Sequence, residues 1–86
     1  MHELSLVASL CARAEAVAAA EGAVRVTSLS VRLGALSHLS PDHLRDHLAR
    51  ASAGSILEGA LVEVTVDTDT ASPTAQEIEL ISVEVE

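Results

Sequence analysis

Hydrophobic residues recur every three or four positions between Leu4 and Glu21, and this spacing predicts an amphipathic helix. Ser5 is a candidate N-cap, and the many alanines raise the helix propensity of the segment. Gly22 stands where a helix commonly ends in a left-handed residue. The stripe expected to face the core consists of Leu6, Val7, Leu10, Ala14, Val17 and Ala18.

A second helix is predicted from Pro41 to about Ala51. Ser40 can cap its first turn, Pro41 lacks only an N–H group that would be unpaired there, and Asp42 favours the positive end of the helix dipole. The apolar stripe of this helix is narrow, since it holds Leu44, Leu48 and Ala51.

Three segments alternate apolar and polar residues as half-buried strands do. They cover residues 24–33, 62–66 and 81–86, and their alternating apolar residues are Leu29, Val31 and Leu33, then Val62, Val64 and Val66, then Ile81, Val83 and Val85. Val24 and Val26 fall on the opposite parity, so the first strand either covers both faces of the sheet at its start or contains a β-bulge. Residues 34–39 are a connection, and the polar segment 67–77, which contains Ser72 and Pro73, predicts an exposed loop.

The predicted order is helix, strand, helix, strand, strand, within one domain that spans residues 1–86. The fold class is α/β of the α+β type, with two helices packed on one face of a three-stranded mixed sheet. A helix between the first two strands favours a parallel pair joined by a right-handed crossover. The last strand is expected to be antiparallel.

Composition and charge limit the core and the partners. Hydrophobic residues make up 49% of the chain without any Phe, Trp or Tyr, so the core must be aliphatic. The net charge of −8 argues against binding to nucleic acid or to an anionic membrane surface. No apolar run approaches the roughly 18 residues of a membrane span, and the N-terminus lacks a basic leader, which predicts a cytoplasmic protein.

A single cysteine, Cys11, excludes a disulfide within the chain and a multi-cysteine metal site. Because Cys11 falls inside the apolar stripe of the first helix, we interpret it as a small buried hydrophobe. The chain has no phosphate-binding loop, no GxSxG nucleophile motif and no HExxH motif, which indicates a protein that is not an enzyme.

The first three residues offer donors that suit a metal. The amine of Met1, the imidazole of His2 and the amide between them are nitrogen ligands of the kind that square-planar Ni(II) or Cu(II) prefers. The simpler interpretation is a surface histidine on a frayed terminus. His43 and His47, spaced i, i+4 on the second helix, are a candidate secondary metal site, although a solvated polar helix face is the more ordinary explanation.

Five segments then match one family in order: Met1–Leu6, Leu33–Ser37, Ser40–Leu44, Leu57–Ala60 and Ile81–Glu86. Together they resemble the HypA/HybF nickel metallochaperones over residues 1 to about 66 and 78–86. The resemblance implies that Met1, His2 and Glu3 bind Ni(II) for delivery to [NiFe] hydrogenase. It also implies a maturation GTPase, the hydrogenase large subunit, or both as partners.

The same resemblance implies a zinc domain with paired CxxC motifs before the last strand, where this chain has the loop 67–77. That loop contains neither Cys nor His, so no zinc is expected. Two functions remain open: a nickel metallochaperone that works without zinc, or a degenerate HypA-like interaction module that no longer transfers metal. A third alternative is a small α/β domain that works without metal and can form a homodimer through an exposed sheet edge.

Overall fold

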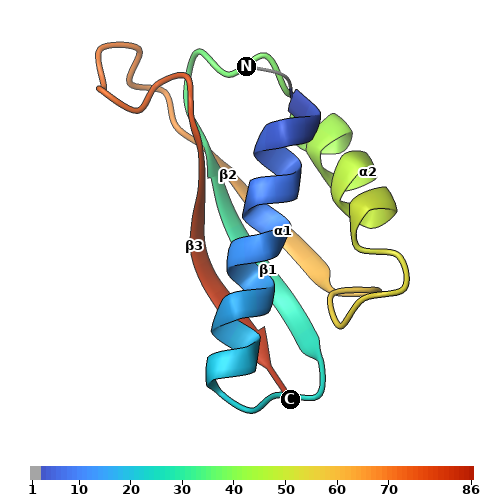
Figure 1. The fold of residues 1–86 in the computed structure, drawn as a ribbon. Helices are drawn as coiled ribbons and strands as arrows, with labels where there is room; N and C mark the ends of the chain where they lie inside the picture. The colour runs from blue at the N-terminus through green and yellow to red at the C-terminus, as the bar shows by residue number, and fades with distance from the viewer. Residues whose placement is uncertain (1–2) are drawn as a thin grey trace.

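The computed structural model describes residues 3–86, which form two helices and three strands (Figure 1). The sheet has the order β2-β1-β3, in which β1 pairs with β2 in parallel and with β3 antiparallel. Both helices lie on the same face of the sheet. The predicted fold class, element order and strand directions are confirmed, with the bounds α1 (Glu3–Ala20), β1 (Val26–Leu33), α2 (Pro41–Ala51), β2 (Leu61–Val66) and β3 (Ile78–Val85).

Helix α1 ends as its sequence predicts but begins earlier. At its C-terminus Gly22 adopts φ +65°, and the N–H groups of Gly22 and Ala23 donate to the carbonyls of Ala19 and Ala18, as in a Schellman motif. At the other end helical geometry already begins at Glu3. The prediction of Ser5 as N-cap is wrong, because that residue lies inside the first turn, where it is exposed.

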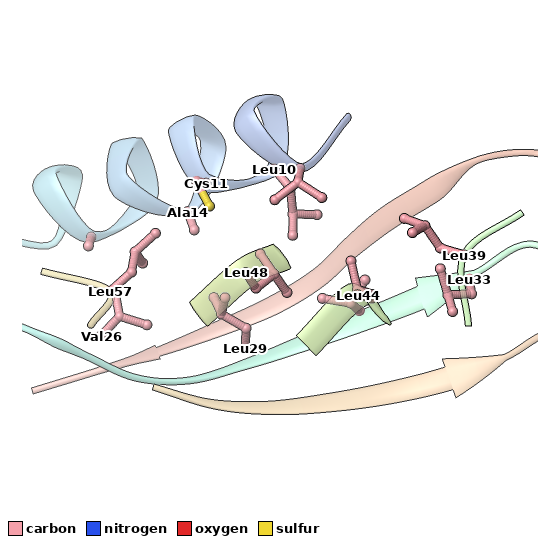
Figure 2. Packing of buried hydrophobic residues seen from close by; sticks show 13 residues of the cluster. Leu10, Cys11, Ala14, Val26, Leu29, Leu33, Leu39, Leu44, Leu48 and Leu57 are labelled. Carbon is pink, nitrogen blue, oxygen red and sulfur yellow. The ribbon is translucent and has the colours of Figure 1, made fainter. Parts of the chain in front are cut away.

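The core lies between the helices and the sheet and is entirely aliphatic apart from one thiol (Figure 2). Helix α1 buries Cys11, as predicted, but Val17 is 43% exposed because it lies on the flank of the stripe. In α2 the buried row continues from Leu48 to Ser52 instead of the predicted Ala51, since four-residue steps keep one face. The largest fully buried side chains are those of Val7, Val26, Val31, Leu33, Leu44 and Leu57.

Of the two alternatives left open for the start of β1, the structure has the β-bulge. Val26 pairs with Val85 and Ser28 with Glu84, so Thr27 is the extra residue, and the bulge lets both Val26 and Leu29 point into the core. Val26 therefore faces the core, although it falls on the opposite parity to Leu29, Val31 and Leu33.

A second irregularity, in β3, overturns part of the predicted alternation. Ser30 pairs with Ser82 and Val31 with Leu80, which leaves Ile81 without a partner in β1 and 59% exposed. Ile78 and Leu80 pack against the core instead. The prediction that Ile81 is inward-facing is wrong because the extra residue reverses the parity of the strand at that point.

The loop 67–77 joins β2 to β3 as predicted, but it is fastened to the end of β1. Ala75 is buried, and its carbonyl accepts a hydrogen bond of 2.7 Å from the N–H of Leu36. The N–H of Gly34 donates to the carbonyl of Glu77 at 2.8 Å. The loop is therefore an ordered part of the fold along its second half.

Candidate functional site

Of the three predicted nickel ligands, only Glu3 is among the described residues. Met1 and His2 lie outside the described residues, and Glu3 is the first residue of α1. The ligand set Met1, His2 and Glu3 therefore stays a prediction, and the structure describes the helix that follows it.

That helix is held firmly close to its start. Val7 and Leu10, one and two turns into α1, are 1% and 4% exposed and belong to the core. The carboxyl end of β1 and the connection to α2 lie at the same end of the molecule as the start of α1 (Figure 1). Leu39 anchors this connection in the core. A metal bound just before α1 would therefore lie next to a well-packed part of the fold.

The histidine pair of α2 lies on a charged, largely exposed face. His43 is exposed and His47 half-buried. The neighbouring Asp46 lies 3.0 Å from Arg50 in an ion pair, and Asp42 lies 3.6 Å from Arg45. Within residues 3–86 no group of three or more His, Cys, Asp or Glu side chains could hold a metal ion. The structure thus brings no third described ligand to His43 and His47.

Cys11 is buried in the core, as the sequence predicts. Desolvation raises the pKa of its thiol, and the nearby Glu15 carboxylate raises the pKa further. The thiolate is the form that binds soft metals and reacts with electrophiles. Cys11 is therefore a packing residue with its reactivity suppressed.

A cluster around Arg32 was not anticipated from the sequence. Arg32 Nη1 lies 2.8 Å from Asp67 Oδ2, and its Nη2 donates to Thr74 Oγ1 at 2.7 Å and to Glu79 Oε1. The hydrogen bond from Arg32 lowers the pKa of Glu79, and Glu79 in turn raises the pKa of Arg32. One arginine thus ties β1 to β3 and to both halves of the loop 67–77. The sequence did hold one indication: Arg32 alternates with the core residues of β1, and the acids Asp67 and Glu79 stand at the ends of the two neighbouring strands.

No helix among the described residues is long and apolar enough to cross a membrane.

Comparisons with known proteins agree on one family. The family model described as "Hydrogenase/urease nickel incorporation, metallochaperone, hypA" matches residues 1–85. The hydrogenase maturation factor HypA of Roseiflexus sp. (strain RS-1) is 48% identical over 64 residues, which are 74% of this chain and 52% of that protein. HypA of Nitrosospira multiformis is 36% identical over 64 residues, 74% of this chain and 56% of that protein. The aligned segment thus spans about half the length of these relatives.

The same fold occurs in a solved structure. The solution structure of the Ni metallochaperone HypA from Helicobacter pylori is similar with a TM-score of 0.81, covering 99% of this chain and 97% of that chain at 18% identity. At that identity the likeness establishes the fold alone. Because the family model extends over nearly the whole sequence, first residues included, this chain belongs to the HypA family of nickel-incorporation metallochaperones.

Proposed function

We propose that this protein binds Ni(II) at its N-terminus through Met1, His2 and Glu3 and passes the metal on by protein contact during [NiFe] hydrogenase maturation. The observation that carries the proposal is the family match from residue 1 to residue 85, which includes the three donor residues. The proposed partners are the maturation GTPase, the hydrogenase large subunit, or both, and the protein works as a monomer or a homodimer. Its role is metal transfer, and no catalytic step is assigned to it.

The start of α1 supports this chemistry. The first four N–H groups of an α-helix have no intrahelical acceptor, so backbone amides at this point are not committed to the helix. Helical geometry begins at Glu3, immediately after the imidazole-bearing residue in the sequence. The positive end of the helix dipole also favours the negative charge that an amide gains when it loses its proton. Amine, amide and imidazole nitrogens together suit square-planar Ni(II).

We further propose that the loop 67–77 stands in place of the zinc module that the family resemblance implies. The loop lacks Cys and His, whereas a structural zinc site needs about four such ligands. The contacts of Arg32 with Asp67 and Thr74 close the chain at this point without a metal. We therefore assign nickel, and not zinc, to this protein.

A second function is favoured by the length difference. The aligned segment covers about half of each of these relatives, and the loop 67–77 has no ligand for the zinc that the family resemblance implies. A HypA-like interaction module that has kept the fold and lost metal transfer would have this appearance.

Nickel titration of protein with a native, untagged N-terminus separates the two. We expect one Ni(II) per chain, a d–d spectrum typical of square-planar coordination, and loss of binding in His2→Ala and in protein whose Met1 amine is acetylated. The double variant His43→Ala/His47→Ala serves as the control and should bind normally. The chain contains no aromatic residue, so protein absorption does not obscure charge-transfer bands in the near ultraviolet. Weak binding that His2→Ala leaves unchanged would refute the metallochaperone and favour the interaction module.

A further inference from the structure

An apolar groove of about 470 Å³ lies between α2 and the first residues of β2. Leu48 and Leu57, each 2% exposed, are among the core residues that line it. Ala49 and Leu61 line it from exposed positions, and Leu61 is 72% exposed. The turn 52–60 beside the groove lies toward the end of the molecule opposite to the start of α1 (Figure 1). The groove is therefore separate from the proposed nickel site.

The groove adjoins an open sheet edge. β2 is an edge strand, and no described strand pairs with its outer side. The N–H of Asp67 donates inward to the carbonyl of Leu33 at 2.9 Å, whereas the carbonyl of Val62 accepts from Arg45 Nε at 3.2 Å on the outer side. Since N–H and C=O of one residue point the same way in a strand, Val64 and Val66 direct their backbone groups outward like Val62. The outer edge of β2 thus presents a short row of main-chain N–H donors and C=O acceptors.

The other edge of the sheet is protected against pairing. β3 carries the unpartnered Ile81, which distorts its edge, and the exposed Glu84 follows shortly after. Bulges and charged residues are devices by which natural sheets prevent strand addition. β2 has a regular register with β1 over all six residues and lacks a bulge. An added strand therefore fits β2 and not β3.

The two faces of β2 define the chemistry of an added strand. Val62, Val64 and Val66 share the helix-covered face, and Glu63 lies between them on the open face. A strand laid beside β2 alternates in the same way, so apolar residues would meet the valines and basic residues would meet Glu63. A second copy of the chain carries the same charge of −8 and is disfavoured electrostatically.

The groove has room for one bulky side chain of a partner. The chain is without Phe, Trp and Tyr, and small residues such as Ala49, Gly59 and Ala60 leave the hollow between Leu48 and Leu57 unfilled. Aromatic anchors seated in apolar pockets supply much of the affinity of protein interfaces. An aromatic residue at the end of the added strand would occupy this space.

We propose that the β2 edge and its groove form a docking site for an extended segment of a partner protein, in which apolar and basic residues alternate and one aromatic side chain enters the groove. The segment adds to the sheet as a fourth strand through main-chain hydrogen bonds to Val64 and Val66. Arg45, whose side chain is 47% exposed, gives way at Val62 when the strand arrives.

A synthetic peptide tests the proposal directly. The probe is acetyl-Trp-Lys-Val-Lys-Val-Lys-amide, and because the protein has no aromatic residue, the fluorescence comes from the probe alone. We expect a saturable blue shift as the indole leaves water. With Trp at the start of β2 the probe lies parallel to β2, so the second and third lysines donate their main-chain N–H groups to the carbonyls of Val64 and Val66. The matched probe with Glu in place of each Lys, and the probe methylated at those two main-chain nitrogens, should each bind at least about tenfold more weakly.

A pair of variants places the binding site. Ala49→Phe fills the mouth of the groove from an exposed helical position, and it should lower the affinity for the probe at least about tenfold. Ala16→Phe, at an exposed position of α1, is the control and should leave binding unchanged. Binding that Ala49→Phe does not weaken, or no blue shift at millimolar protein, would overturn the proposal.

Two further readouts separate this site from other possibilities. If the protein alone sediments as a dimer that Ala49→Phe dissociates, the occupant is a second copy and the partner-segment proposal is wrong. Nickel titration of Ala49→Phe should match that of the unaltered protein, because the groove is lined by residues between Arg45 and Val62 together with Cys11 and Leu29. Failure of the docking site therefore leaves the proposed nickel function standing, and the reverse also holds.

Discussion

Replacing Gly34 with alanine tests how tightly the loop 67–77 is fitted to the sheet. A Cβ at this position would lie 2.2 Å from the carbonyl oxygen and 2.4 Å from the carbonyl carbon of Ala75, and 2.6 Å from the carbonyl oxygen of Thr74. These are main-chain atoms, which cannot rotate away as a side chain can. The same segment receives the hydrogen bond from Leu36 to Ala75. The loop must therefore move for the methyl group to fit.

The expected cost follows from these contacts. Overpacking that forces a backbone shift costs about 1–3 kcal/mol, and a weakened hydrogen bond adds roughly 0.5–1.5 kcal/mol. We expect the free energy of unfolding of Gly34→Ala to fall by about 2 kcal/mol or more. For a domain of this size, that corresponds to a melting temperature lower by roughly 8–16 °C.

Urea denaturation followed by far-ultraviolet circular dichroism measures the effect, since the chain has no aromatic fluorophore. Gly22→Ala is the control: Gly22 adopts φ +65°, and a methyl group added there would meet nothing within 4 Å, so only left-handed strain of about 1 kcal/mol applies. The double variant Gly34→Ala/Ala75→Gly should remain as unstable as Gly34→Ala, because the clash is with backbone atoms. A change below about 0.5 kcal/mol for Gly34→Ala would refute the reasoning.

Three other outcomes follow from the same structure. Arg32 lowers the pKa of Glu79 below its ordinary value of 4.5, so this pair stabilises the fold above pH 4.5 and loses its effect as the pH falls through the folded-state pKa. In Glu79→Gln the free energy of unfolding, measured by urea denaturation, should therefore depend less on pH on the acid side. Cys11 should react with a disulfide reagent at pH 8 far more slowly in native protein than in urea, and equal rates would contradict its burial. Leu57→Ala, at a 2% exposed position, should cost about 2–5 kcal/mol in the same denaturation assay, whereas Leu61→Ala, at a 72% exposed position, should stay within about 0.5 kcal/mol.

Much of the fold could be predicted because each element carries its own periodicity and punctuation. Gly22 marks the end of α1, and Ser40 caps α2 by accepting a hydrogen bond from the N–H of His43. The parallel pairing of β1 and β2 follows from the helix between them. Val26 breaks the alternation, which made a bulge one of two alternatives for the start of β1, and only the pairing with β3 places it at Thr27.

The errors arise where tertiary pairing overrides local pattern. Ile81 alternates correctly with Val83 in the sequence, and only the register against β1 shows that an extra residue turns it outward. Ser5 is a good N-cap residue, but the helix continues past it to Glu3. The Arg32 cluster and the groove draw on segments far apart in the sequence, so periodicity within one segment could not predict them.

The strand order leaves the connection between β2 and β3 free to vary in length. β2 and β3 flank β1 on opposite sides, so the connection between them has to cross the end of β1, a span of about 10 Å. Eleven residues exceed what that span requires, and neither strand depends on a tight turn for its register, because each pairs with β1 alone. Lengthening such a loop adds only about 0.6 kcal/mol of closure entropy per doubling. In this chain Arg32 and the close packing of Gly34 against Ala75 fix the loop across the end of β1.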